Sequence, residues 1–300
     1  MKQRKIKRKA WVVMTIMMCA IFTTYVLADA FLIPKTIIIV DDDRPIDIDP
    51  EPKEPMDPII TDTGYQDENI HITIETVKEN GVVFYVVDIR LTDSKYLKSA
   101  FAKDTYGKNI NEVTSSIAKR HEAILAINGD FYGFRDRGLI IRNGVFYRDF
   151  PRKAPDNRTL LVDEQGEFSF VVEGSVDGEK LTDKGIVQSF SFGPVLVENG
   201  QTQPIETNFS KTVNPRTAIG MVEPLHYIII VADGRTSESV GMRLETLANE
   251  FVKRGVLMAY NLDGGGSSTL WFNGKVLNNP TTDGKWIGER KVSDILYFGY

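Results

Sequence analysis

The chain has 300 residues, of which 42% are hydrophobic and 26% are charged, and its formal net charge is −5. This is the balance of a globular protein, and the negative net charge gives no electrostatic reason to expect nucleic acid as a partner. The single cysteine, Cys19, lies in an apolar N-terminal segment, so the rest of the chain has no disulfide and no thiol chemistry.

Residues 1–30 predict a membrane segment. Residues 2–9 carry six positive charges, and residues 10–28 carry none. A basic flank followed by an apolar stretch is typical of an export signal whose charged end stays in the cytoplasm. We expect an uncleaved anchor, which makes this a single-pass protein of the cell membrane. The sequence also leaves cleavage open, because Ala28-Asp29-Ala30 resembles a signal-peptidase site and its use would give a secreted protein.

Residues 31–62 predict a linker. Residues 41–58 read DDDRPIDIDPEPKEPMDP, and such a tract cannot bury enough apolar surface to offset chain entropy. Its first three aspartates are acidic enough for Ca²⁺, but without the glycine and glutamate of an EF-hand they are better explained as solvated linker. The folded domain is therefore expected to occupy residues 63–300.

Two patterns in this domain predict β-strands. Asn-Gly pairs between apolar or alternating runs are a strong signal for tight hairpins. They stand at 80–81, 143–144, 199–200 and 273–274. Fully apolar runs of strand length predict central strands that are covered on both faces. These runs are 82–89, 123–127, 226–233 and 256–263.

Two segments have helical periodicity. In residues 242–255 the apolar residues recur at i, i+3, i+4, i+7 and i+8, and Gly255 ends the pattern. Residues 109–121 place three apolar side chains on one helical face. Each segment leads directly into an apolar strand. We therefore expect a mixed α/β (α+β) domain with a largely antiparallel, hairpin-rich sheet on which helices pack.

Polar residues gather where three predicted strands end. Residues 128–132 read NGDFY, 233–235 read DGR and 261–267 read NLDGGGS, while NPRTAIG at 214–220 opens a strand. Each cluster alone is ordinary turn chemistry, since Asn and Asp tolerate left-handed backbone and Gly supplies positive φ. Together they predict one rim of a sheet on which functional loops are mounted.

Other site chemistries find less support in the sequence. His71, His121 and His226 fall in no metal-ligand spacing. The stretch GGGSST at 264–269 lacks the lysine of a P-loop. We therefore expect no metal site and no cofactor, although Ca²⁺ or Mg²⁺ is possible without support from ligand spacing.

Six motifs together resemble the phosphodiester glycosidase family. They are NGDFY, SFGPVLVENG, NPRTAIG, VADGR, GMRLETLA and NLDGGGSST, in the family's order and spacing from about Ala123 to Tyr300. The family often has NGGFF where this chain has NGDFY, so Asp130 is expected to be a local addition to the site. The resemblance implies hydrolysis of a sugar-1-phosphodiester, which frees the sugar and leaves a phosphomonoester.

The residues suit this reaction. Cleavage of a sugar C1–O bond passes through an oxocarbenium-like state that glycosidases serve with carboxylates. Asp233 and Asp263 are predicted to be the catalytic carboxylates, in roles that the sequence does not separate. Phosphate is a good leaving group, so positive charge can replace the acid. Arg216 and Arg235 are predicted to grip the phosphate oxygens, and Asn128 to bind sugar or water.

The three consecutive glycines at residues 264–266 also suit a phosphate ligand. The backbone N–H groups of Gly264, Gly265 and Gly266 are predicted to form an anion-binding nest, because no Cβ keeps phosphate away. The hydroxyl of Ser267 is expected beside it. Thr217 is expected to contact phosphate.

The sequence leaves the function partly open. We expect an extracytoplasmic hydrolase acting on a sugar-phosphate glycopolymer of the envelope, or on its glycolipid precursor. A protein that binds envelope polysaccharide without turnover would carry the same anchor and linker. A metal-dependent phosphodiesterase that uses the aspartates as ligands would cleave on the phosphorus side. The sugar, the aglycone and the oligomeric state are not predicted.

Overall fold

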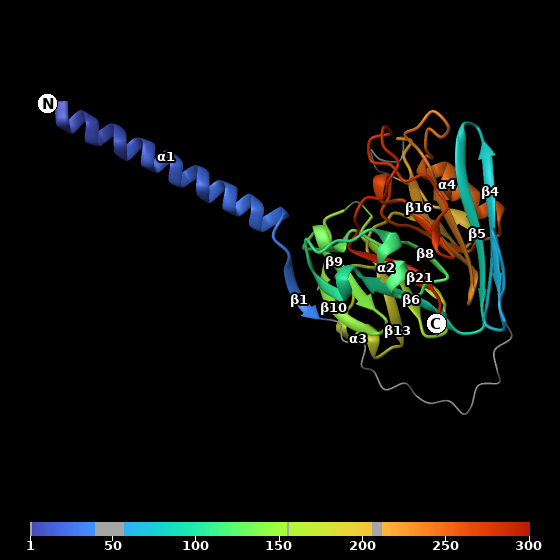
Figure 1. The fold of residues 1–300 in the computed structure, drawn as a ribbon. Helices are drawn as coiled ribbons and strands as arrows, with labels where there is room; N and C mark the ends of the chain where they lie inside the picture. Colours follow the sequence, from blue (N-terminus) through green and yellow to red (C-terminus); the bar gives the residue numbers. More distant parts are fainter. Residues whose placement is uncertain (1, 40–56, 155, 206–211) are drawn as a thin grey trace.

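The computed structural model describes residues 2–39, 57–154, 156–205 and 212–300 (Figure 1). The N-terminal helix α1, Lys2–Phe31, projects from a folded domain (Figure 1). Within it, Val13–Phe31 is long and apolar enough to cross a membrane, by length and composition, with a mean hydropathy of 1.7.

Part of the predicted linker forms a strand. Strand β1, Lys35–Ile39, pairs antiparallel with β7, Thr105–Lys108. The Nδ2 atom of Asn109 donates hydrogen bonds to the carbonyls of Ala30 and Ile33, each over 3.2 Å. Residues 40–56 of the predicted linker lie outside the described residues. The last part of the predicted linker includes the short strand β2, Ile59–Thr61, of the large sheet described below, and the boundary between residues 62 and 63 stays a prediction.

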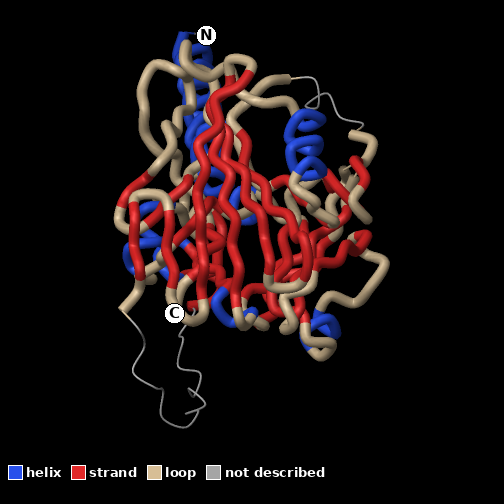
Figure 2. The backbone as a smooth tube through the Cα atoms, turned by 90° about the vertical axis from the view of Figure 1, so that its right-hand side faces the viewer, coloured by secondary structure: helices blue, strands red, loops and turns tan. Residues whose placement is uncertain are grey.

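The domain is built on two large antiparallel sheets, whose strands run side by side in Figure 2 with long loops gathered at their upper end. The first has nine strands in the order β15 (Gln201–Thr202), β14 (Val195–Glu198), β18 (Met258–Asn261), β16 (Arg216–Glu223), β17 (His226–Ala232), β5 (Val82–Leu91), β4 (Ile70–Glu79), β3 (Gly64–Gln66) and β2 (Ile59–Thr61). The second has five strands in the order β20 (Lys275–Val276), β19 (Leu270–Phe272), β8 (Leu125–Asn128), β21 (Asp294–Phe298) and β6 (Leu97–Phe101). The mixed, mostly antiparallel fold class that the sequence predicts is confirmed.

Smaller elements complete the described part of the domain. The remaining sheets are β12 (Phe168–Val172), β11 (Arg158–Asp163) and β13 (Ile186–Phe190), and the pair β10 (Val145–Phe150) and β9 (Gly138–Arg142). The helices are α2 (Thr114–Arg120), α3 (Glu179–Thr182) and α4 (Leu244–Lys253). The 3-10 turns are η1 (Ser94–Tyr96), η2 (Ala102–Asp104), η3 (Tyr132–Phe134) and η4 (Gly265–Ser267).

Strand β17 shows why the apolar runs are central strands. Its alternate residues Tyr227, Ile229 and Val231 join the core between the two large sheets. Ile228 and Ile230 point to the opposite face and join the core beneath α4. Because successive side chains of a strand face opposite sides, a strand covered on both faces must be apolar throughout.

The two predicted helices fare differently. Helix α4 is confirmed, and its Leu247 and Phe251 are completely buried against the nine-stranded sheet. Helix α2 begins only at Thr114, so the predicted helix from residue 109 is wrong over its first turn. Asn109 takes a left-handed φ of +59°, and Glu112 forms a β-bridge with Val292. A tertiary contact therefore overrides the local periodicity.

All four Asn-Gly hairpins are confirmed. They join β4 to β5, β9 to β10, β14 to β15 and β19 to β20. Both residues of each pair have positive φ, for example +52° at Asn80 and +73° at Gly81. Two consecutive positive φ angles define the type I′ turn, whose twist matches the flanking strands.

Candidate active site

The polar strand ends meet at one edge of the domain. Strands β17 and β18 both run antiparallel to β16 and flank it, so the ends of β17 and β18 lie beside the start of β16. In register, Arg216 stands opposite Ala232, and Ala218 opposite Asn261. The predicted rim therefore forms.

The rim is made by two sheets, whereas the sequence predicted one. Strand β8, which ends at Asn128, belongs to the five-stranded sheet. The Nδ2 atom of Asn128 donates a hydrogen bond of 2.6 Å to the carbonyl of Asp263, which follows β18 of the nine-stranded sheet. Apolar runs identify central strands but carry no information about which sheet they join.

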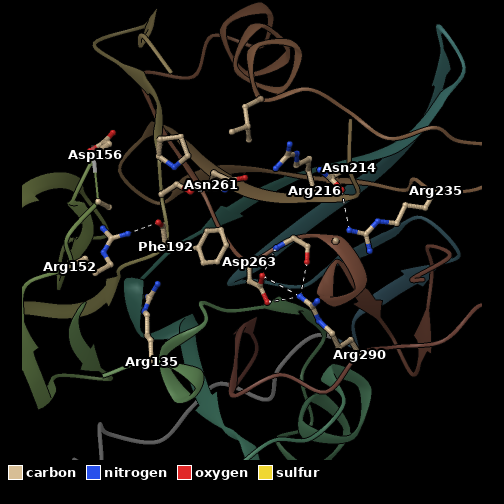
Figure 3. A pocket seen from close by; sticks show the side chains of 16 residues that line it. Arg135, Arg152, Asp156, Phe192, Asn214, Arg216, Arg235, Asn261, Asp263 and Arg290 are labelled. Carbon is tan, nitrogen blue, oxygen red and sulfur yellow. Dashed lines mark hydrogen bonds and ion pairs between the residues drawn. The ribbon is translucent and has the colours of Figure 1, made fainter. Parts of the chain in front are cut away.

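A cavity of about 510 Å³ opens at this edge (Figure 3). Its described lining comes from segments that are far apart in the chain: Arg135, Arg152, Ala154, Asp156, Phe192, Gly193, Pro194, Asn214, Arg216, Arg235, Leu244, Asn261, Asp263, Gly264, Gly265 and Arg290. Five of these side chains are arginines and two are aspartates. The excess of positive charge makes the cavity suitable for an anion.

Asp263 is the acidic group at the centre of Figure 3. Its Oδ1 atom accepts a hydrogen bond of 2.8 Å from the Gly264 amide, and its Oδ2 atom lies 3.2 Å from Nη2 of Arg290. Burial raises the pKa of Asp263 above its ordinary value, while the Arg290 guanidinium acts in the opposite direction. A buried carboxyl group with a raised pKa in a cavity is suited to proton transfer.

No sequence motif indicates Arg290 as a site residue. Its side chain donates hydrogen bonds to the carbonyl of Gly264 over 3.0 Å and to Oγ of Ser267 over 2.9 Å. It lies 27 residues after Asp263 in a loop outside every motif used above. No local pattern signals it, because only the folding of that loop brings the guanidinium to the carboxylate.

Arg216 and Arg235 lie close to each other on one side of the cavity (Figure 3). Nε of Arg216 donates to the carbonyl of Met242 over 3.1 Å. Burial, with a smaller contribution from Arg235, lowers the pKa of Arg216 to about 10, so it is still a cation at neutral pH. Nη2 of Arg235 donates to Oδ1 of Asn214 over 3.1 Å, and Nη1 donates to the carbonyl of Thr282 over 2.5 Å.

Gly264 and Gly265 line the cavity, but the predicted nest of three amides is not preformed. The Gly264 amide donates a hydrogen bond to the Asp263 carboxylate, and the Gly265 amide donates one to the carbonyl of Pro215 over 2.9 Å. The close approach of neighbouring atoms to this backbone explains the need for glycine better. Gly265 has a φ of +63°, and a Cβ there would lie 3.0 Å from Nη2 of Arg235.

Gly266 and Ser267 lie behind the cavity. A Cβ on Gly266 would overlap Oγ1 of Thr282, so this glycine lets the loop that carries Thr282 pack against the triplet. The hydroxyl of Ser267 accepts the hydrogen bond from Arg290 described above. Neither residue is among the cavity lining.

Asp233 is also outside the cavity lining. Its Oδ1 atom accepts hydrogen bonds from Nδ2 of Asn278 over 2.9 Å and from the Asn279 amide over 3.0 Å. Burial raises its pKa, and these two hydrogen bonds act against that rise. Asp233 therefore holds the start of the loop that carries Arg290, and the structure does not bring the two predicted carboxylates into one cavity.

Asn128 and Thr217 connect the two sheets beneath the cavity. Oδ1 of Asn128 accepts hydrogen bonds from Oγ1 of Thr217 over 2.8 Å and from the Thr269 amide over 3.2 Å. Together with its bond to the Asp263 carbonyl, Asn128 fixes the backbone on both sides of the glycine loop.

Asp130, the departure from the family pattern, points into the interior. Its Oδ2 atom lies 3.3 Å from Nη2 of Arg142, and its carboxylate accepts the amides of Tyr132 and Ser191 over 2.7 and 3.0 Å. It is fully buried and does not line the cavity. The structure thus makes it part of an internal ion cluster rather than an addition to the site.

The opposite side of the cavity presents groups that the sequence did not predict as site residues. Arg135, Arg152 and Asp156 lie on the side away from Arg216 and Arg235 (Figure 3). Asn261 lies between the two sides. Its Nδ2 atom donates to the carbonyl of Gly193 over 2.7 Å, whereas its buried Oδ1 atom has no hydrogen-bond partner among the described residues.

No grouping of three or more His, Cys, Asp or Glu side chains that would suit a metal ion occurs within residues 2–39, 57–154, 156–205 and 212–300. Asp41, Asp42 and Asp43, weighed above as Ca²⁺ ligands, lie outside the described residues.

Sequence comparison agrees with the six motifs. The model of the phosphodiester glycosidase family matches residues 121–299. The chain belongs to this family. The SPbeta prophage-derived uncharacterized protein YomE of Bacillus subtilis (strain 168) is 31% identical over an alignment of 242 residues, and the match covers 73% of this chain and 37% of YomE. The human N-acetylglucosamine-1-phosphodiester alpha-N-acetylglucosaminidase is 36% identical over an alignment of 123 residues, and the match covers 37% of this chain and 24% of the human protein.

The matches therefore span little more than a third of the length of YomE and about a quarter of the human enzyme.

Solved structures agree on the fold. The auto-inhibited catalytic domain of the zebrafish enzyme of the same name superposes with a TM-score of 0.61 at 21% identity, covering 77% of this chain and 83% of that one. A hypothetical protein from Synechocystis superposes with a TM-score of 0.59 at 15% identity, covering 77% and 62%.

Proposed function

We propose that this phosphodiester glycosidase hydrolyses the C1–O bond of a sugar-1-phosphodiester outside the cytoplasm. The observation that carries the proposal is the position of buried Asp263 in a cavity lined by Arg216, Arg235 and Arg290. A carboxylate beside several guanidinium groups suits a substrate whose reacting carbon is attached to phosphate. The relatives named for N-acetylglucosamine-1-phosphodiester favour an α-linked N-acetylglucosamine as the first sugar to test.

The arginines bind the phosphate in this proposal. Arg216 and Arg235 approach from the start of β16 and the end of β17, and Arg290 lies beside Asp263. As the C1–O bond breaks, negative charge grows on the departing phosphate oxygen. Fixed guanidinium groups stabilise that charge without transferring a proton, so no carboxylic acid is required to protonate the leaving group.

Asp263 acts at C1. The oxygen of a water molecule bonds to C1 while one water proton passes to the Asp263 carboxylate, and the C1–O electron pair leaves with the phosphate. The products are the free sugar and a phosphomonoester, and Asp263 then releases its proton to solvent. Inversion at C1 is expected for this single displacement, whereas retention would mean that Asp263 attacks C1 itself.

The other polar residues receive supporting roles. The buried Oδ1 atom of Asn261, which accepts no hydrogen bond from a described residue, is an acceptor for a sugar hydroxyl. Asp233 and Asn128 position the loops that carry Arg290 and Asp263 through the hydrogen bonds described above. We assign them no contact with the substrate.

The membrane context is part of the same proposal. The apolar segment Val13–Phe31 follows a basic flank, so it would leave residues after Phe31 on the outer side of the membrane. A substrate in an envelope glycopolymer, or in its glycolipid precursor, is then within reach of the domain.

Hydrolysis in ¹⁸O-labelled water tests the reaction. We expect the full chain, in detergent, to release N-acetylglucosamine from its α-1-(methyl phosphate) diester with ¹⁸O in the sugar. Asp263→Asn should lower the rate by on the order of 10³-fold. Label in the phosphate, together with sensitivity to a chelator, would instead establish a metal-dependent phosphodiesterase. Binding of the diester without any release would establish a carbohydrate-binding protein.

A further inference from the structure

The side of the cavity opposite Arg216 and Arg235 holds more positive charge than the proposed phosphate site explains. Arg135 and Arg152 line this side, and Asp156 lies beside them (Figure 3). Phe192 lies between this side and Arg216 and Arg235 (Figure 3), so we take a sugar whose phosphate is bound by Arg216 and Arg235 to lie over Phe192 toward this side. The charges here are therefore relevant to the sugar rather than to the leaving group.

Most of these charges already have partners. Nε of Arg152 lies 2.6 Å from Glu173, and the two groups are nearly or completely buried. Asp156 pairs with Arg158, with Nη2 of the arginine 2.9 Å from Oδ2 of the aspartate. Each of these two arginines thus has a carboxylate of its own, and neither needs a ligand for its charge to be balanced.

Among the described residues, Arg135 shares its carboxylate partner with a second arginine. Oδ2 of Asp130 is 3.7 Å from Nη2 of Arg135 and lies closer to Nη2 of Arg142, at 3.3 Å. The Nη2 atom of Arg135 donates a hydrogen bond to the carbonyl of Ser191. The buried Nε atom makes no hydrogen bond to any described residue.

Burial works against the charge of Arg135. Its side chain is only 20% exposed, and burial lowers its pKa, with Asp130 acting in the opposite direction. Neighbouring Arg152 and Arg148 add repulsion. A partly buried guanidinium with two positive neighbours and a shared carboxylate is stabilised when an anion binds beside it.

We propose that Arg135 binds a carboxylate carried by the sugar itself, so that the substrate is a phosphodiester of an acidic sugar. This inference rests on the proposed function, because it takes the phosphate to lie at Arg216 and Arg235. In a pyranose the C6 substituent projects from C5, across the ring oxygen from C1. A C6 carboxylate therefore lies beyond the ring oxygen from the phosphate, and a sugar that extends away from Arg216 and Arg235 can turn this edge of its ring toward Arg135.

Two substrates that differ only at C6 test this inference. They are the α-1-(methyl phosphate) diesters of N-acetylglucosamine and of the corresponding uronic acid, in which a carboxylate replaces the C6 hydroxymethyl group. We expect wild-type kcat/KM to favour the uronic acid by about 10-fold or more, because a guanidinium that pairs with a carboxylate discriminates strongly against a neutral group. The Arg135→Gln variant should lose this preference.

Arg137→Gln is the matched control. Arg137 lies two residues away, donates a hydrogen bond to the carbonyl of Pro151 over 2.8 Å, stacks on Phe150, and does not line the cavity. Its replacement should leave the preference unchanged. Arg135→Lys keeps the charge and should keep part of the preference, which separates recognition of the carboxylate from a loss of folding.

Calorimetric binding of both diesters to the same proteins separates this inference from the proposed function. Equal kcat/KM for the two substrates, or an undiminished preference in Arg135→Gln, overturns the inference and leaves the hydrolase intact. No turnover of either diester, with binding of the uronic acid weakened at least 10-fold by Arg135→Gln alone, overturns the hydrolase and supports the acidic-sugar site. Absence of both turnover and Arg135-dependent binding overturns both.

Discussion

Asp294 gives a test of the interior electrostatics that does not depend on substrate. Its Oδ2 atom accepts hydrogen bonds from Nε and Nη2 of Arg142 over 2.9 and 2.7 Å, and the same Nη2 lies 3.3 Å from Asp130. The Asp130 and Asp294 side chains are completely buried. Burial raises the pKa of Asp294 to about 7, Asp130 adds to the rise, and Arg142 acts against it.

The sign of the effect on stability follows from proton binding. In the unfolded chain Asp294 has a pKa of about 4, so between pH 4 and pH 7 the folded state binds more protons than the unfolded state. The free energy of unfolding therefore falls as pH rises through this window, and the contribution of Asp294 is constant above it. The difference between about 4 and about 7 corresponds to on the order of 4 kcal/mol.

The variant Asp294→Asn carries a permanently neutral side chain of nearly the same shape. We expect its free energy of unfolding to stay within about 1 kcal/mol of wild type at pH 5. At pH 8 it should exceed wild type by roughly 2–4 kcal/mol, because the cost of ionising Asp294 is gone. Urea unfolding of the full chain in detergent, followed by near-UV circular dichroism from pH 5 to pH 8, measures both values.

Asp130→Asn is the contrasting variant. Although burial favours its neutral form, Arg142 and Arg135 hold the pKa of Asp130 below its ordinary value, so its ionised form stabilises the fold. We expect this variant to be less stable than wild type at pH 8. If Asp294→Asn instead lost stability between pH 5 and pH 8 as steeply as wild type, the protonation argument for the cluster would be refuted.

The remaining predictions concern the cavity. Removing the charge in Arg290→Met should raise the pKa of Asp263 further, because Arg290 lowers that pKa. The acid limb of the pH profile of kcat/KM should then move to higher pH. An unmoved limb would mean that Asp263 is not the group that titrates there. Asp233→Asn should reduce activity less than Asp263→Asn when both are assayed with the same diester, and an equal loss would argue for a direct catalytic role of Asp233. Gly266→Ala should lower the free energy of unfolding by about 1–3 kcal/mol in urea, since its Cβ would overlap Thr282, and an unchanged value would contradict that packing.

Much of the fold could be predicted because its signals are local. The type I′ turn at Asn80 and Gly81 needs two residues that tolerate positive φ, and the Asn-Gly pair states this directly. The apolar run of β17 reflects burial of both faces of one strand. The helical pattern of α4 survives because that helix packs on its sheet with the expected face.

The candidate site could be predicted only in part. The strand ends that carry Arg216, Arg235 and Asp263 were found, because polar residues after apolar runs stand out. The sequence does not give the direction in which a side chain points. It therefore groups Asp233 and Asp130 with the site, although neither lines the cavity.

The sequence by itself determined the strands, the hairpins, the apolar N-terminal segment and the family. Tertiary structure alone decided that two stacked sheets share the rim, through contacts such as the one between Asn128 and the Asp263 backbone 135 residues later. It also decided that Arg290 and Arg135 reach the cavity from loops without any repeating pattern. The physical reason is that backbone propensity and periodicity depend on neighbouring residues, whereas a charged cavity depends on which distant loops the packed core brings together.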